Sequence, residues 1–337
     1  MRILAGGVLA GGVLAGGALA GGALVAPAAH AQEAPPRPDP SLPDLSTPLG
    51  KGIDGERRAR IEEALRKGAH EQAEALLLEA VEREPPSAEL LRLLGGVYFV
   101  RSNYLGAAVA FKKAEVLAPL DERSRFTLAM SYVVLGHRDW ARPEIQKLSA
   151  SAPRNPLYLY WTARFDYDDG QYAAAAKGLV QAIALDGRFV KAHDNLGLCY
   201  EALGKYDEAI RSYQEAIRLN REAATRSPWP PLNLGVLLIR LDRLDEAEPF
   251  FRESLRADPR FPQGHYHLGV ALEKKGRAAD AVQELEEAAR FDASYPEPHY
   301  ALARLYRRSG NAEKADRALE LFQRLKKEKG QANSGPR

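Results

Sequence analysis

Residues 195–216 read NLGLCYEALGKYDEAIRSYQEA, and this stretch decides the fold. Apolar side chains recur in it at spacings of three and four residues, which is the period of a helix with one buried face. Gly204 separates two such runs, at a point where a helix end often needs a left-handed residue. Gly197 is small enough to let a second helix approach closely. The stretch therefore predicts two antiparallel helices joined at Gly204.

The same pattern recurs through most of the chain. Thirty-four residues earlier, Gly170 and Ala175 occupy the places of Gly204 and Ala209, and the pattern continues upstream to Gly68. Downstream the register slips by four residues and then resumes. No segment alternates apolar and polar residues with a period of two, so we expect no β-sheet. Eight units begin near residues 54, 88, 122, 156, 190, 228, 262 and 296.

The spacing and residue types of these units resemble the tetratricopeptide repeat family from residue 54 to residue 329. The resemblance implies an all-α fold, a right-handed superhelical α-solenoid of about eight 34-residue helical hairpins. It also implies a concave surface, and the usual work of that surface in the family is to hold segments of other proteins. Stacked repeats contact only their neighbours, so the end repeats need polar outer surfaces. The last helix, which we expect to end near Lys329, fits that capping role.

One junction breaks the period, between Asn220 and Pro231. Four extra residues there predict that the second helix of the fifth unit is longer by about one turn. Ser227 and Pro228 then end that helix. The insertion either presents Trp229 as a binding anchor or is a tolerated length variant at a hairpin junction.

The first 31 residues have the pattern of an export signal. Arg2 precedes an uncharged run over residues 3–26, and an Ala-x-Ala motif ends at Ala31. This predicts a secretory signal peptide over residues 1–31, cleaved after Ala31, in an exported bacterial protein of the periplasm. The alternative is a membrane anchor formed by residues 3–26 that stays uncleaved. Frequent prolines predict a flexible linker over residues 32–53, and we expect a disordered tail over residues 330–337.

Composition excludes several classes of function. The chain has 337 residues, of which 45% are hydrophobic and 27% charged, as in an ordinary folded protein. Its formal net charge of +2 argues against nucleic acid as the main partner. The single cysteine, Cys199, can form no intrachain disulfide and no cysteine-based zinc site.

In the family, the first helix of each hairpin lines the groove through its second, fifth, sixth, ninth, twelfth and thirteenth positions. Carried over to this chain, these positions give an apolar groove toward the N-terminal side and an arginine-rich groove near the C-terminus. Lys274 and Arg307 also stand at groove positions of the last two units. Aromatic and arginine side chains are the types that dominate binding energy at interfaces. The predicted groove residues are Phe99, Phe126, Met130, Tyr160, Trp161, Tyr167, Lys191, Asp194, Asn195, Trp229, Asn233, Tyr266, His267, Tyr300, Arg304 and Arg308.

Two of these positions suggest a way to hold a peptide. Asn195 and Asn233 share the sixth position, where asparagines of some family members bind the backbone of an extended peptide. An amide suits that role because it can both donate and accept a hydrogen bond. Only two consecutive units carry the asparagine, and His267 replaces it in the next. Lys191 stands at a position of the family's carboxylate clamp, but its partner positions do not match.

The sequence predicts no catalytic, cofactor or metal site. His193, His265 and His299 share the fourth position of their units, and layers about 10 Å apart cannot share one metal ion. Cys199 is expected to be a buried, inert thiol. We therefore predict a non-enzymatic protein–protein interaction scaffold of the bacterial cell envelope, with a protein or peptide partner and no nucleic acid or small-molecule substrate. The alternative is a non-catalytic subunit of a secretion or envelope-biogenesis enzyme complex.

Overall fold

The computed structural model describes residues 43, 45, 49 and 53–333, with side chains described as far as residue 330. The expected signal peptide, most of the expected linker and residues 334–337 lie outside this part of the chain. The described residues form sixteen α-helices and no strand. The helices are α1 (Gly55–Arg66), α2 (His70–Arg83), α3 (Ala88–Val100), α4 (Tyr104–Leu117), α5 (Glu122–Val134), α6 (Arg138–Ser151), α7 (Pro156–Asp168), α8 (Tyr172–Leu185), α9 (Val190–Ala202), α10 (Tyr206–Glu222), α11 (Trp229–Arg240), α12 (Leu244–Ala257), α13 (Pro262–Lys274), α14 (Ala278–Phe291), α15 (Pro296–Arg308) and α16 (Ala312–Asn333).

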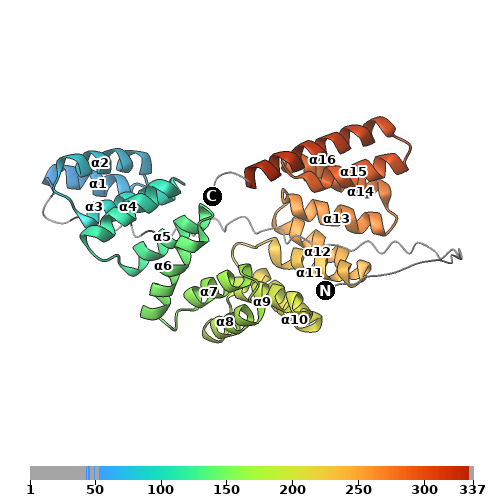
Figure 1. Ribbon diagram of the computed structural model, residues 1–337, viewed down its shortest axis with the longest axis horizontal. Coiled ribbons are helices and arrows are strands. Elements are labelled where there is room, and N and C mark those ends of the chain that lie inside the picture. Colours follow the sequence, from blue (N-terminus) through green and yellow to red (C-terminus); the bar gives the residue numbers. More distant parts are fainter. Residues whose placement is uncertain (1–42, 44, 46–48, 50–52, 334–337) are drawn as a thin grey trace, which may run out of the picture. The chain divides into compact units, whose positions relative to one another are not determined.

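The helices follow one another as a series of eight hairpins (Figure 1). Each helix packs on the next one in the chain, and most first helices also contact the first helix of the next hairpin. Contacts limited to near neighbours define a solenoid. The predicted all-α solenoid is therefore confirmed. Helix α16 extends to Asn333, so residues 330–333, which we expected in the tail, are helical.

Left-handed residues join the two helices of each hairpin. Six glycines have positive φ at these turns, among them Gly204 at 72°. There the Lys205 amide donates to the Tyr200 carbonyl at 2.8 Å, which satisfies an end carbonyl of α9. The second and sixth hairpins use Ser102 and Asp242 at the same place, with φ of 62° and 59°. The glycine pattern thus marked six turns, and two non-glycine residues complete the set.

The helix crossing inside each hairpin depends on a matched pair of side chains. A Cβ added to Gly197 of α9 would lie 2.4 Å from Tyr213 Cε1 of α10, and one added to Gly235 of α11 would lie 2.6 Å from Phe251 Cε1 of α12. The equivalent places in the fourth hairpin hold Ala163 and Leu179 (both buried). An aromatic residue on the second helix therefore requires glycine on the first, because only glycine leaves room for the ring.

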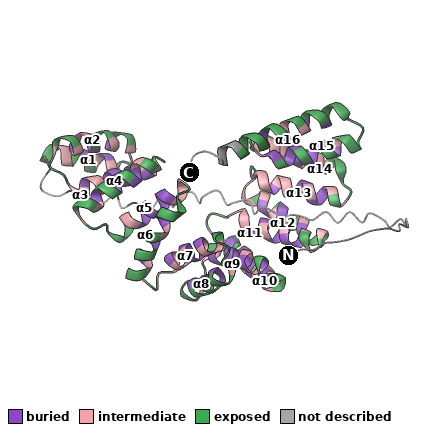
Figure 2. Cartoon of the chain, viewed as in Figure 1, coloured by how far each residue is buried: buried purple, intermediate pink, exposed green. Residues whose placement is uncertain are grey.

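The buried side chains form three hydrophobic clusters along the solenoid. Figure 2 shows that buried residues are spread along the whole series of helices rather than gathered in one place. Each hairpin thus contributes to the core through its neighbours, as a one-dimensional array does.

The break in period lengthens one helix as the sequence predicts. Helix α10 has 17 residues, where α8 and α12 have 14. The Asn220 side chain then accepts from the Ser227 amide and donates to the Ser227 carbonyl, both at 2.8 Å. Ser254 Oγ donates to the Pro228 carbonyl at 2.8 Å. These bonds fix the connection between the fifth and sixth hairpins.

Candidate protein-binding groove

The structure divides the sixteen predicted groove residues into three groups by exposure. Those that are buried cannot meet a partner without a change in packing, whereas those that are exposed can. The buried group is Phe99, Phe126, Met130, Tyr160, Trp161, Asp194 and Asn195. The half-buried group is Tyr167, Trp229, Asn233, Tyr266 and His267. The exposed group is Lys191, Tyr300, Arg304 and Arg308.

Aromatic side chains of the groove pack between neighbouring repeats. Tyr160 of α7 lies 5.0 Å from Phe189, measured between ring centroids, and Tyr266 of α13 lies 5.4 Å from Tyr295. Phe189 and Tyr295 each close one unit just before the next first helix begins. Ring pairs at these distances are favourable packing contacts. Most of this aromatic surface therefore serves cohesion between repeats.

The two predicted peptide-binding asparagines take part in bonds within the chain. Asn195 accepts from Arg164 Nη1 of the preceding repeat at 2.8 Å and donates to the Lys191 carbonyl at 2.9 Å. Asn233 donates to Asp194 Oδ1 at 3.1 Å. Asn195 is only 3% exposed. These amides join first helices of successive repeats to one another.

A buried carboxylate lies beside this polar cluster. Glu201 of α9 accepts from the Tyr213 hydroxyl at 2.8 Å and is bonded to Arg240 of α11. Burial raises the pKa of Tyr213 well above its usual value, and the nearby Glu201 charge adds to that rise. Burial also raises the pKa of Cys199 to about 12, so this thiol stays protonated at neutral pH. A protonated, buried thiol is a packing residue, not a nucleophile.

Apolar residues that precede α1 cover the beginning of the groove. Leu49 is buried in the same hydrophobic cluster as Leu93 of α3. A Cβ added to Gly96, at the ninth position of α3, would lie 2.8 Å from Leu45 Cδ2 and 3.0 Å from Pro43 Cβ. The chain's own residues therefore occupy the groove-facing side of α3.

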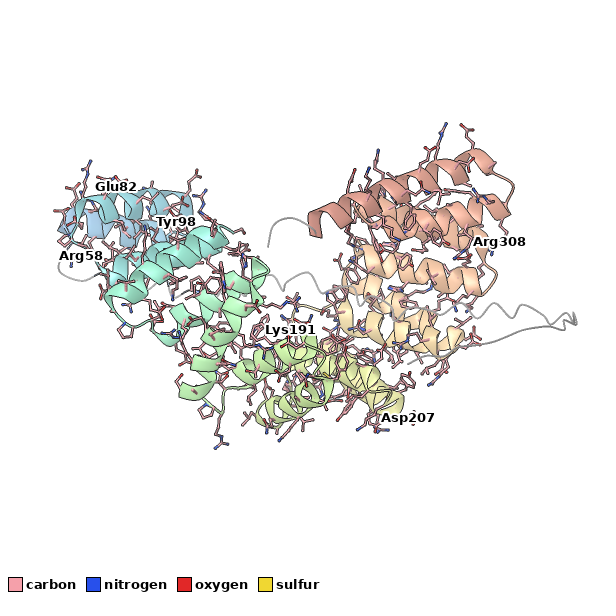
Figure 3. The ribbon with its side chains drawn as sticks, viewed as in Figure 1. Arg58, Glu82, Tyr98, Lys191, Asp207 and Arg308 are labelled. Carbon is pink, nitrogen blue, oxygen red and sulfur yellow. The ribbon has the colours of Figure 1, made fainter. Side chains whose placement is uncertain are left out.

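The last hairpin carries a basic hollow that remains open. It has a volume of about 350 Å³, and Tyr300 at its edge is 50% exposed. Arg308, labelled in Figure 3, lies at the end of α15, where α15 lines the hollow with α16. Its lining residues are Tyr300, Ala303, Arg304, Arg307, Arg308 and Leu319.

Carboxylates hold the arginines of this hollow in place. Arg304 Nε donates to Glu273 Oε1 at 3.1 Å, and Arg308 Nη1 reaches the same oxygen at 3.4 Å. Arg307 Nη2 donates to Asp316 Oδ1 at 3.0 Å. The Glu273 side chain is only 8% exposed. Glu273 was not among the predicted groove residues, although it stands at the twelfth position of its unit, which the resemblance to the family assigns to the groove.

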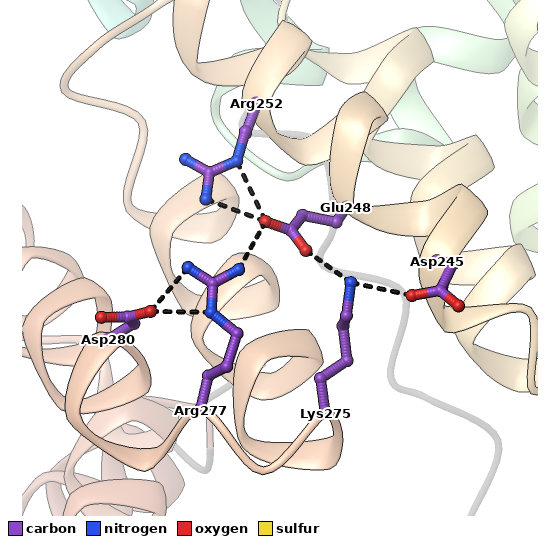
Figure 4. Close-up of polar contacts among 6 residues, drawn as sticks. All are labelled: Asp245, Glu248, Arg252, Lys275, Arg277 and Asp280. Atoms are coloured by element: carbon purple, nitrogen blue, oxygen red, sulfur yellow. Dashed lines mark hydrogen bonds and ion pairs between the residues drawn. The ribbon is translucent and has the colours of Figure 1, made fainter.

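An ion-pair network ties the sixth hairpin to the seventh (Figure 4). Glu248 of α12 accepts from Arg252 at 2.9 Å, from Lys275 at 2.8 Å and from Arg277 at 3.0 Å. The hydrogen bonds and charges of Lys275 and Arg252 lower the pKa of Glu248 to about 2, although burial opposes the shift. The network contains three acids and three bases, so it is electrically balanced and connects repeats.

Two of the three histidines that share the fourth position of their units contact a backbone carbonyl of the preceding loop. His193 Nε2 lies 3.1 Å from the Gly187 carbonyl, and His265 Nε2 lies 3.1 Å from the Pro259 carbonyl. Burial would lower the pKa of His265, but Glu284 and that carbonyl raise it above its usual value. Within residues 53–330 no group of three His, Cys, Asp or Glu side chains could hold a metal ion.

The sequence matches known family models over more than half of its length. Models described as tetratricopeptide repeats match residues 58–122, 187–260, 232–296 and 296–320. A model described as subunit 3 of the anaphase-promoting complex, or cyclosome, matches residues 144–216. The chain belongs to the tetratricopeptide repeat family, which confirms the resemblance. No curated protein matches it.

Several solved structures share the fold. A tetratricopeptide repeat protein from Parabacteroides merdae ATCC 43184 is 17% identical with a TM-score of 0.61, over 80% of this chain and 98% of that one. Yeast Tom70 is 18% identical with a TM-score of 0.57, over 87% of this chain and 68% of that one. PilW, described as a widely conserved type IV pilus biogenesis factor, is 20% identical with a TM-score of 0.54, over 60% and 92%. Among the helices of the described part, none is long and apolar enough to cross a bilayer.

Proposed function

We propose that this protein is a non-catalytic scaffold that binds a segment of a partner protein on the groove side of its repeats. The observation that carries the proposal is the open hollow of the last hairpin, where exposed Tyr300, Arg304 and Arg308 stand together at groove positions. Tyrosine and arginine are the side chains most enriched at binding hot spots. A solenoid offers such a surface without any catalytic domain.

We further propose that the scaffold works in the bacterial cell envelope, in the periplasm. The pattern of residues 1–31 supports export. The fold is shared with PilW, whose description names pilus biogenesis. The chain then assists assembly of an envelope complex, either by transient capture of a peptide or helix or as a fixed non-catalytic subunit.

A pull-down from periplasmic extract tests whether the protein binds a partner, and whether it does so transiently or as a fixed subunit. The bait is the mature chain with a C-terminal tag, and the test variant is Arg307→Gln. This substitution removes only the exposed ion pair between Arg307 and Asp316, so it should leave the fold intact. The matched control is Lys177→Gln on α8, an exposed cation for which the structure gives no partner. We expect a partner that Arg307→Gln weakens and Lys177→Gln does not. Recovery at fixed stoichiometry indicates a subunit, and the absence of any partner that responds to groove variants contradicts the scaffold role.

Export has its own test. Amino-terminal sequencing of the protein isolated from the periplasmic fraction should begin at Gln32. A chain that stays in the membrane fraction with residues 1–31 attached would support the anchor instead.

A further inference from the structure

We infer that the basic hollow of the last hairpin binds an acidic, extended peptide segment that also carries an apolar side chain. This inference rests on the proposed scaffold function and names the chemistry of its partner. The hollow is lined by residues of α15 and α16 only, so one hairpin supplies the lining of the site.

The first argument is charge. Arg304, Arg307 and Arg308 line the hollow, and no acidic side chain is among its lining residues. Glu273 and Asp316 are the acids to which these guanidinium groups are bonded. Three cations against two acids leave a local excess of positive charge in a chain that is nearly balanced overall. Such an excess attracts carboxylates and raises the rate of encounter with them.

The second argument is the number of hydrogen-bond donors. A guanidinium group has five N–H donors. To described residues, Arg307 donates through Nη2 alone and Arg308 through Nη1 alone. Several N–H groups of both side chains are therefore available for ligand carboxylates. Arginine is suited to bind a carboxylate through two parallel hydrogen bonds, because its planar guanidinium group matches the two carboxylate oxygens.

The third argument is that the arginines are oriented before a ligand arrives. Glu273 is nearly buried and bonds Arg304 and Arg308 together, so these two guanidinium groups are fixed beside one another. The Arg304 guanidinium lies 6.0 Å from the centre of the Tyr300 ring, over its face. A side chain that is already ordered loses less entropy on binding. Glu273 thus acts as a positioning residue.

The fourth argument explains the apolar part of the ligand. Ala303 and Leu319 line the hollow together with the arginines, and the Tyr300 ring packs on Phe322 at 5.1 Å between ring centroids. Half of Tyr300 remains exposed at the edge. A volume of about 350 Å³ suits one or two side chains of a peptide. An alternation of acidic and apolar residues would place carboxylates on the arginines and an apolar side chain against Leu319.

The test measures binding of a fluorescein-labelled peptide of alternating Glu and Leu to the mature full chain by fluorescence polarisation. We expect saturable binding that weakens as salt rises. The same peptide with Gln in place of Glu should bind at least about tenfold more weakly, since each carboxylate–arginine pair is worth about 1.4 kcal/mol or more when partly desolvated. Equal binding of the two peptides overturns the inference.

Variants locate the site. Arg307→Gln leaves both bonds to Glu273 in place, and Tyr300→Ala removes the exposed ring; each should weaken binding of the acidic peptide severalfold. The charge-matched control is Lys177→Gln, on a second helix of the fourth hairpin, which should leave binding unchanged. Thermal melting verifies that each variant is folded. Equal loss in the control would place the attraction outside the hollow and overturn the inference.

The two proposals fail differently. A partner protein that is captured independently of Arg307 and Tyr300 keeps the scaffold function and overturns the acidic-peptide inference. A polyanion such as heparin that binds as tightly as the peptide, with no effect of Tyr300→Ala, also overturns it, because charge alone would then explain binding.

Discussion

The pairing of Gly235 with Phe251 permits a sharp prediction about stability. A Cβ at Gly235 would lie 2.6 Å from Phe251 Cε1 and 2.8 Å from Cζ, against ordinary carbon contacts of about 3.5–4.0 Å. Phe251 is fully buried, so its ring cannot move away without displacing its neighbours. Overpacking of this kind costs about 1–3 kcal/mol, and replacing a helical glycine by alanine regains about 1 kcal/mol. The difference between this cost and this gain predicts that Gly235→Ala lowers the free energy of unfolding by about 0–2 kcal/mol.

A second substitution, Phe251→Leu, removes the ring that blocks the added Cβ and completes a double-mutant cycle with Gly235→Ala. Phe251→Leu alone should cost roughly 1–2 kcal/mol through the space it leaves. In the double variant the new methyl group of Ala at position 235 enters that space. The fourth hairpin already has this combination, with Ala163 and Leu179 buried at the equivalent positions. The double variant should thus be more stable than the sum of the single effects predicts, by about 1–3 kcal/mol.

Urea unfolding followed by circular dichroism measures all four members of the cycle under one condition. Gly330→Ala on α16 is the control, because a Cβ there meets nothing within 4 Å. It should leave stability unchanged or slightly higher. Additive effects of Gly235→Ala and Phe251→Leu would refute the idea that these two positions constrain one another.

Three more predictions concern other parts of the solenoid. Glu248 has a folded pKa of about 2, below its usual 4.5, so the stability that its ionised form contributes is complete above pH 4.5 and is lost as pH falls toward 2. Glu248→Gln should lower the free energy of unfolding by about 2 kcal/mol at pH 7, and urea unfolding should show that this difference from wild type shrinks between pH 4.5 and pH 2. Asn220→Ala should cost about 1–2 kcal/mol and speed hydrogen exchange at the Ser227 amide, which loses its acceptor; unchanged exchange would contradict this. Leu49→Asp should uncover Leu93, lower the thermal midpoint of unfolding and increase the binding of an apolar dye. The control Leu105→Asp, at an exposed leucine, should not increase dye binding.

The period of 34 residues was enough to predict the helices and most of their turns. Gly204 and its equivalents mark turns because a positive φ is costly for other residues. Ser102 and Asp242 have positive φ without being glycine. At their turns the Asn103 and Arg243 amides donate to the Tyr98 and Leu238 carbonyls at 2.8 Å, which is the bond that Lys205 makes beside Gly204. The length of α10 also follows from the four added residues.

Positions in a repeat do not say which side chains remain open to a partner. Asn195 stands where an amide could bind a peptide, yet Arg164 from the preceding repeat is bonded to it. Tyr160 is covered because Phe189 packs on it. Such contacts join residues far apart in the sequence and depend on side-chain lengths, which a pattern of spacings does not encode. The basic end of the groove was predictable because charge is a property of the sequence itself.

The matched crossing pairs bear on how such a chain can grow and recombine. Gly197 and Tyr213 lie in one hairpin, as do Ala163 and Leu179. Duplication or deletion of a whole unit therefore carries both members of a pair together and keeps the crossing intact. An exchange within a hairpin would instead place Ala163 against Tyr213, where a methyl group and a ring compete for the same space. Whole repeats are thus the natural units of insertion, and the loops between hairpins are the places where the chain can be cut and rejoined.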